Sequence, residues 1–80
     1  MITGLQVRAA RSALRWSIED LANSAGIAGK TVSRIEAIDA VPESTLKTIM
    51  QIKSSLEAAG IEFIGTPDDG PGIRIRTPKP

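Results

Sequence analysis

The stretch SIEDLANSAGIAGKTVSRIE spans positions 17–36 and contains the signals that decide the fold. Ser17 is followed three residues later by Asp20, a spacing typical of a capped helix N-terminus. Gly26 suits the left-handed position that lets a chain turn sharply after a helix. Apolar residues recur at helical spacing on both sides of this glycine. The sequence therefore predicts two short helices, one ending at Gly26 and one spanning about residues 28–37.

The second of these helices is expected to have two chemically different sides. Val32 and Ile35 lie three residues apart, a spacing that predicts burial on one face. Ala22, in the preceding helix, is small enough for the second helix to cross over it closely. The remaining positions are expected to face outward, and they are Gly29, Lys30, Ser33 and Arg34.

One further helix is expected on each side of this pair. The first spans about residues 4–14, because Thr3 can cap it and Gln6 can reach back to the cap. The other runs from about residue 43 or 44 to 59, after a loop in which Pro42 biases its neighbour away from helix. The apolar residues expected to face inward are Leu5, Ala9, Ala10, Ala13 and Leu14 in the first helix and Leu46, Ile49, Met50 and Leu56 in the other.

After Gly60 the apolar residues alternate with a period of two, which is typical of strands. Residues 61–64 and 72–76 are the strand candidates, and the Gly-, Pro- and Asp-rich segment between them favours a turn. A disordered tail is the alternative, but β-branched and aromatic residues at strand spacing favour a β-hairpin. The predicted fold is mainly α: a four- to five-helix bundle over residues 1–60, a short C-terminal β-hairpin over 61–76, and a frayed tail over 77–80.

The composition limits the classes of function open to the chain. Its 80 residues suffice for one small domain, and 41% of them are hydrophobic. With no Cys and no His, it lacks disulfides, Cys/His zinc sites and the nucleophile–base pairs that need either residue. No pair of carboxylates and no phosphate loop indicates an enzyme, a metal ion or a cofactor. No segment approaches the roughly 20 apolar residues that span a bilayer, so a cytoplasmic protein is expected.

Ten residues of the 17–36 stretch fall on positions of one known pattern: Ser17, Leu21, Ala22, Gly26, Ile27, Thr31, Val32, Ser33, Ile35 and Glu36. This is the pattern of the Cro/C1-type helix-turn-helix (Xre) family, which the chain resembles over about residues 4–58. Arg11 matches the arginine of the family's first helix, and Pro42 the proline that opens its next helix. Two positions depart from the pattern, since Arg15 stands where the family usually has Gly and Ala28 where it usually has a capping Ser.

The resemblance implies a sequence-specific regulator of transcription that binds double-stranded DNA. The second helix of the pair would enter the major groove, and steric repression is the simplest mode of action. Arg34 could then bind a guanine through O6 and N7, beside Lys30 and Ser33, while Gly29 would allow a close backbone approach. Contacts with the DNA backbone are expected at Ser17, Ile18, Thr31, Arg8 and Arg15, and a structural ion pair is implied between Arg11 and Glu36.

The hairpin suggests a homodimer, because an isolated two-stranded hairpin is marginal in water. Ile61 and Phe63 are expected to share one face, and Ile73 and Ile75 another. These residues could pack against the helix before the hairpin or against a second subunit. A two-fold dimer would suit a palindromic DNA site.

An alternative function is that of a protein-interaction module, such as an antitoxin-like partner or an adaptor. The net charge is only +1, and positions 1–65 hold seven basic and seven acidic residues. Bulk charge therefore does not indicate nucleic acid, and any cations that bind DNA must be placed locally.

Overall fold

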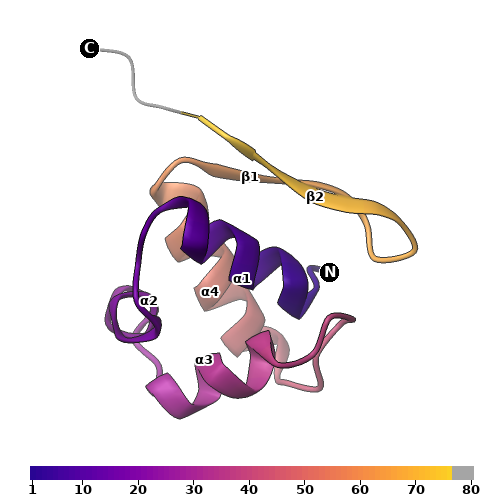
Figure 1. The fold of residues 1–80 in the computed structure, drawn as a ribbon. Helices are drawn as coiled ribbons and strands as arrows, with labels where there is room; N and C mark the ends of the chain where they lie inside the picture. Colours follow the sequence, from indigo (N-terminus) through magenta and orange to yellow (C-terminus); the bar gives the residue numbers. More distant parts are fainter. Residues whose placement is uncertain (77–80) are drawn as a thin grey trace.

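The computed structural model describes residues 1–76 as four helices followed by one antiparallel hairpin. Figure 1 shows the helices gathered into a bundle, with the hairpin lying across one end of it. The order and type of these elements confirm the prediction of a helical bundle with a C-terminal hairpin. The predicted frayed tail, residues 77–80, lies outside the described residues. The elements are α1 (Gly4–Ala13), α2 (Ile18–Ala25), α3 (Gly29–Glu36), α4 (Leu46–Ala58), β1 (Ile61–Thr66) and β2 (Asp69–Ile75).

Helix α1 begins at the predicted cap but buries a different face from the one expected. Thr3 and Gln6 cap each other's backbone amides, as the capping-box spacing predicts. The buried apolar residues are Val7 and Ala10, whereas Leu5 is 42% exposed. The predicted stripe was therefore wrong at Leu5, and also at the exposed residues Ala9 and Ala13. Alanines lie on several sides of this helix, so apolar periodicity alone could not identify the buried side.

The corner between α1 and α2 is closed by backbone hydrogen bonds around Arg15. The Trp16 N–H donates to the Arg11 carbonyl and the Arg15 N–H to the Ser12 carbonyl, each at 3.0 Å, which is the pattern of a Schellman motif. Arg15 has a φ of 58°, the left-handed conformation that usually requires glycine. The corner therefore keeps the shape that a glycine would give it, and the arginine side chain adds steric strain.

The turn between α2 and α3 follows the prediction closely. Ser17 and Asp20 form the expected capping box at the start of α2. Gly26 ends that helix with a φ of 72°, and its N–H and that of Ile27 both donate to the Ala22 carbonyl. Ala28 precedes α3 without any side-chain cap. The two helices thus meet at a sharp turn that is formed by local backbone chemistry.

Helix α4 starts later than expected and is rotated relative to the prediction. Thr45 caps it through the backbone N–H of Thr48, so the helix begins at Leu46, four residues after Pro42 and three after Glu43. The expectation that Leu46 and Met50 face inward was wrong, because they are 62% and 55% exposed. The core-facing residues of α4 are Ile49, Ile52 and Leu56.

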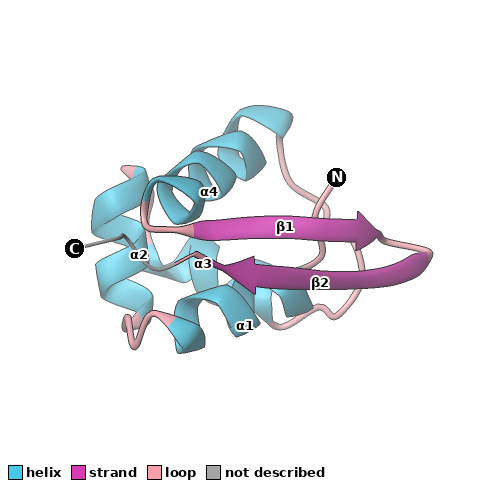
Figure 2. Ribbon diagram, turned by 90° about the horizontal axis from the view of Figure 1, so that it is seen from above, coloured by secondary structure: helices cyan, strands magenta, loops and turns pink. Residues whose placement is uncertain are grey.

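The hairpin is paired in a register that places its apolar residues on one face. Ile61 pairs with Ile75 and Phe63 with Ile73, and directly opposed residues of antiparallel strands project to the same side. The prediction of two separate apolar faces was therefore wrong. Figure 2 shows the hairpin lying over α1 and α4. Ile61 is buried, Phe63 and Ile73 pack against the core, and Ile75 remains 57% exposed.

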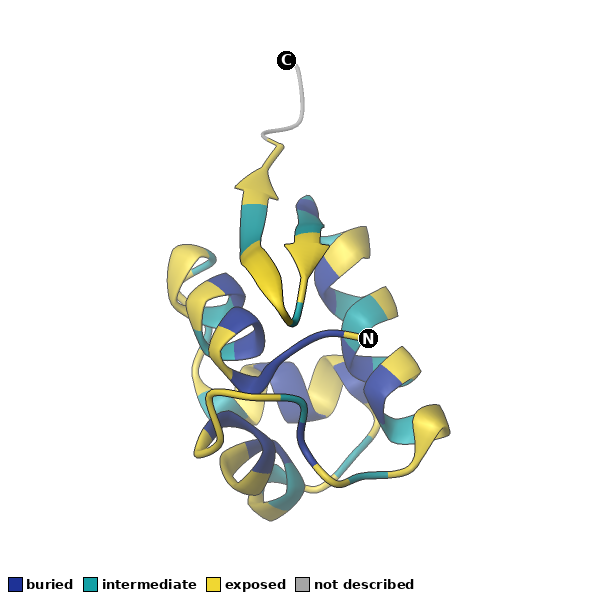
Figure 3. Cartoon of the chain, turned by 90° about the vertical axis from the view of Figure 1, so that its right-hand side faces the viewer, coloured by how far each residue is buried: buried dark blue, intermediate teal, exposed yellow. Residues whose placement is uncertain are grey.

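The core lies where all four helices and the hairpin meet (Figure 3). Leu21, Val32, Ile52 and Leu56 are fully buried, so each of three helices contributes a large aliphatic side chain. Within residues 1–76, no helix is long and apolar enough to cross a membrane. The buried residues belong to all parts of the chain, and the hairpin is packed as part of the same core.

The strained corner leads to a prediction about stability. Replacing Arg15 with Gly should stabilise the fold by about 0.5–1 kcal/mol, because glycine adopts a positive φ without the Cβ clash. Thermal unfolding followed by circular dichroism measures the change. Arg34→Gly is the matched control; it places glycine inside α3 and should destabilise the protein by about 1 kcal/mol. Equal losses for both variants would contradict the assignment of strain to Arg15.

Candidate nucleic-acid interface

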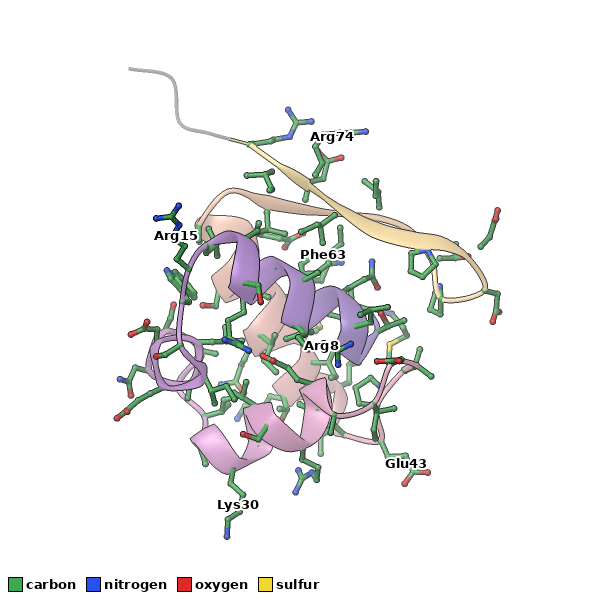
Figure 4. All side chains as sticks on the ribbon, in the orientation of Figure 1. Arg8, Arg15, Lys30, Glu43, Phe63 and Arg74 are labelled. Atoms are coloured by element: carbon green, nitrogen blue, oxygen red, sulfur yellow. The ribbon has the colours of Figure 1, made fainter. Side chains whose placement is uncertain are left out.

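The outward side of α3 gathers the residues that the sequence assigns to base reading. Lys30, Ser33 and Arg34 are exposed, while Gly29 and Thr31 are partly covered. Figure 4 shows Lys30 pointing away from the bundle. Within residues 1–76, the side chains of Lys30, Ser33 and Arg34 form no ion pair and no hydrogen bond with other residues. Their charges and donors are therefore free for an external partner.

This side of α3 is held in place by residues on its other side. Val32 is fully buried and Ile35 is 1% exposed. Because three residues span almost one helical turn, both side chains point into the core, and the intervening positions are turned outward. α3 packs against α1 and α2. The outward residues are thus carried on a helix that is anchored in the core.

An ion pair connects α1 with the end of α3. The Arg11 Nε lies 2.8 Å from Glu36 Oε2, and its Nη2 lies 2.9 Å from Oε1, a bidentate geometry. The Arg11 Nη1 also donates to the Trp16 carbonyl at 2.8 Å. The hydrogen bond to Glu36 raises the pKa of Arg11, while burial acts in the opposite direction. The pair that the sequence resemblance implies is thus present, with Arg11 directed inward.

Arg8 makes two further contacts with the same region. Its Nη1 donates to the Glu36 carbonyl at 2.6 Å, and its Nη2 lies 2.9 Å from Asp39 Oδ1. The Asp39 side chain is 73% exposed, so this ion pair is open to solvent and is weak by general experience of surface pairs. The structure therefore places Arg8 near the end of α3, with part of its charge neutralised.

Gly4 brings the start of α1 against the end of α3, a contact that the sequence analysis did not identify. A Cβ at this position would collide with the carbonyl oxygens of Ile35 and Ile38. The Gly4 N–H donates to the Ala40 carbonyl at 3.0 Å. A glycine in the first turn of a helix is unfavourable by propensity, and this was the available signal that the position has a steric function.

The remaining candidate residues lie around α2. Ser17 is exposed and Ile18 is half-buried at the N-terminus of that helix, where the positive end of the helix dipole attracts anions. The Asp20 carboxylate accepts from the Ser17 N–H at 2.8 Å, so one negative charge already occupies this end. Figure 4 places Arg15 at the α1–α2 corner, well away from Lys30. The structure does not bring Arg15 together with the outward residues of α3.

The arginines of the hairpin are engaged with a single carboxylate. Arg74 lies 2.9 Å from Glu62, and the Arg76 Nε donates to the same carboxylate at 2.7 Å. Both arginines hold the pKa of Glu62 below its usual range, chiefly through the Arg76 hydrogen bond. Within residues 1–76, no cluster of three or more acidic residues could hold a metal ion. Lys30 and Arg34 differ from these arginines in sharing one exposed side of a helix without an acidic partner within residues 1–76, and this side of α3 is the candidate site.

The close approach at Gly4 can be tested by substitution. Gly4→Ala should destabilise the protein by about 2–3 kcal/mol, because the backbone of α3 and its following loop must shift to admit a methyl group. Urea unfolding measures the loss. Gly29→Ala is the matched control, since a Cβ there would meet only Ile18 Cγ2 at 3.8 Å. A loss of the same size in the control would show that glycine at position 4 has no special steric function.

A comparison with known protein families and with curated protein sequences finds no match to this chain. The candidate site therefore stands on its geometry: an outward helix side with free cations, supported by a buried side and held by α1.

Proposed function

We propose that this chain is a sequence-specific transcriptional regulator, acting in the cytoplasm, that binds double-stranded DNA with α3 in the major groove. One observation carries the proposal: Lys30, Ser33 and Arg34 share the outward side of a helix whose other side is buried in the core, and they have no partner within residues 1–76. An α-helix fits the width of the major groove. The resemblance of residues 17–36 to the Cro/C1-type helix-turn-helix supports the same assignment.

The proposed base readers differ in the chemistry that each can offer. Arg34 carries a planar guanidinium that can donate two hydrogen bonds to guanine O6 and N7. Lys30 offers a point charge, and Ser33 a hydroxyl group that can donate or accept. Gly29 leaves room for the DNA backbone or a base edge to approach closely. Such a site would read a few base pairs per subunit.

Contacts with phosphates would come from the edges of the site. The amide of Ile18 lies at a helix N-terminus that suits an anion, next to the exposed Ser17, whose own N–H donates to Asp20. Thr31 borders the outward side of α3. Arg8 would have to share its guanidinium between a phosphate and Asp39. Arg15 lies before the N-terminus of α2, at the α1–α2 corner. It would reach the DNA only if the duplex extended past that end of the helix. The electrostatic contribution of one subunit is therefore modest, and because few phosphates are neutralised, the salt dependence of its affinity should be correspondingly small.

A homodimer is part of this proposal, because two weak half-sites combine into one stable site on palindromic DNA. Half-sites about one turn of the duplex apart would match a two-fold dimer. The hairpin residues that the sequence assigned to dimerisation have little surface left for it. Ile61, Phe63 and Ile73 pack on the chain's own helices, and Ile75 alone is largely exposed.

A protein-interaction module remains the second candidate function. The observation that favours it is the internal neutralisation of four arginines, Arg8, Arg11, Arg74 and Arg76, by acidic partners. A surface with so few free cations binds DNA weakly unless those cations are well placed. A binding assay with α3 variants separates the two functions.

Selection from a random duplex pool should return a specific sequence. With that duplex, Lys30→Ala and Arg34→Ala should each weaken binding by about tenfold or more, because a good base contact contributes about 1–3 kcal/mol. Gel shifts at several salt concentrations measure the affinity and its salt dependence. Lys53→Ala is the matched control, as it removes the same charge from α4. No selected sequence, or equal losses for Lys30→Ala and Lys53→Ala, would refute groove reading by α3.

A further inference from the structure

The outward face of α4 exposes two large apolar side chains. Leu46 and Met50 are 62% and 55% exposed, and their four-residue spacing places them side by side on the helix. A shallow groove of about 580 Å³ runs along the same helix. Its lining residues on α4 are Lys47, Met50, Gln51, Ser54, Ser55 and Ala58. The adjacent end of α2 contributes Ser24 and Ala25.

The two halves of this face differ in size and in charge. The first half bears the large side chains Leu46 and Met50, and the second bears the small residues Ser54 and Ala58. Lys47 lies near the start of the helix and Glu57 near its end, and neither forms an ion pair within residues 1–76. The first half of the face therefore has large side chains and a positive charge, and the second half has small side chains and a negative charge.

We propose that this face of α4 binds the same face of a second copy of the chain, with the two helices antiparallel and the two-fold axis crossing the interface at the level of residue 52. Residues equally distant from Ile52 then lie level with one another. Leu46 meets the partner's Ala58, and Met50 meets the partner's Ser54, so a large side chain lies beside a small one in each layer. The Lys47 end of one helix lies beside the Glu57 end of the other.

Charge and shape together favour a second copy over another occupant. A parallel arrangement would set the two Lys47 ends side by side and stack large residues on large ones. The antiparallel arrangement places the Lys47 end of each helix beside the Glu57 end of the other. It also packs the large half of each face against the small half of the other. Binding an unrelated partner would not require the two halves of this face to complement each other in size and charge. Self-complementarity is the property that a two-fold interface requires.

This inference supplies a surface for the dimer in the proposed function, and it rests on that function only for the expectation of two-fold symmetry. The hairpin packs on α1 and α4 from another side. The α4 residues in contact with the core, Ile49, Ile52 and Leu56, lie on the opposite side of the helix. The inferred interface is therefore compatible with the packed hairpin.

Sedimentation of the full chain tests the proposal. The unsubstituted protein should dimerise, and Met50→Glu should raise the dimer dissociation constant by about tenfold or more, because it places a charge at the centre of the interface. Leu5→Glu is the matched control: it introduces the same charge at an exposed apolar position on α1 and should leave dimerisation unchanged. Circular dichroism verifies that each variant is folded.

A charge exchange provides a second measurement that does not depend on Met50. Lys47→Glu and Glu57→Lys should each weaken the dimer, and the double variant should restore it. A chain that stays monomeric, a dimer unaffected by Met50→Glu, or a dimer lost only on Ile75→Glu would overturn the proposal. Binding to a duplex with one half-site separates this result from the proposed function, because that binding should depend on Arg34 but not on Met50.

Discussion

The ion pair between Arg11 and Glu36 is the interaction on which the arrangement of the helices depends. One guanidinium holds the end of α3 through the Glu36 carboxylate and the α1–α2 corner through the Trp16 carbonyl. The side chains of Arg11 and Glu36 are only 18% and 5% exposed. In such an environment the attraction does little more than offset desolvation, whereas losing one partner costs about 3–5 kcal/mol. The pair therefore acts mainly to orient α3.

Local signals made much of this arrangement predictable. The caps at Thr3 and Ser17 and the turn at Gly26 depend on residues within a few positions of each other, so their chemistry can be recognised in the sequence. The start of α4 was less predictable, because several residues before it can act as a cap and Thr45 is only one of them. Arg15 illustrates another limit: an arginine does not itself favour the positive φ found here, and the available signal was that it stands where the family pattern usually has Gly.

Long-range contacts were the part that the sequence could not supply. The collision that a Cβ at Gly4 would cause involves carbonyl groups more than thirty positions away. Gln6 likewise caps Thr3 and also donates to the Gly72 carbonyl at 2.9 Å, which fixes the hairpin on α1. The residues proposed to read bases were easier to identify, because helical periodicity separates Lys30 and Arg34 from Val32 and Ile35. Whether those cations are free depends on partners elsewhere, and only the fold provides that information.

The exposed side chains on which the two proposals rest lie on α3 and α4, whereas α1 and the hairpin pair their arginines and cover most of their large apolar side chains. On α1, Arg8 and Arg11 are engaged with α3 or the loop after it. The hairpin directs Phe63 and Ile73 inward and neutralises Arg74 and Arg76 with Glu62. By contrast, the outward side of α3 carries the free cations Lys30 and Arg34, and the outward side of α4 carries the exposed apolar residues Leu46 and Met50. In the proposed function these two features complement each other, because few cations per subunit would make a single DNA half-site weak, and the proposed pairing of α4 faces would supply the second half-site. With a net charge of only +1, the proposed DNA binding would draw on the few free cations of two subunits together rather than on bulk charge.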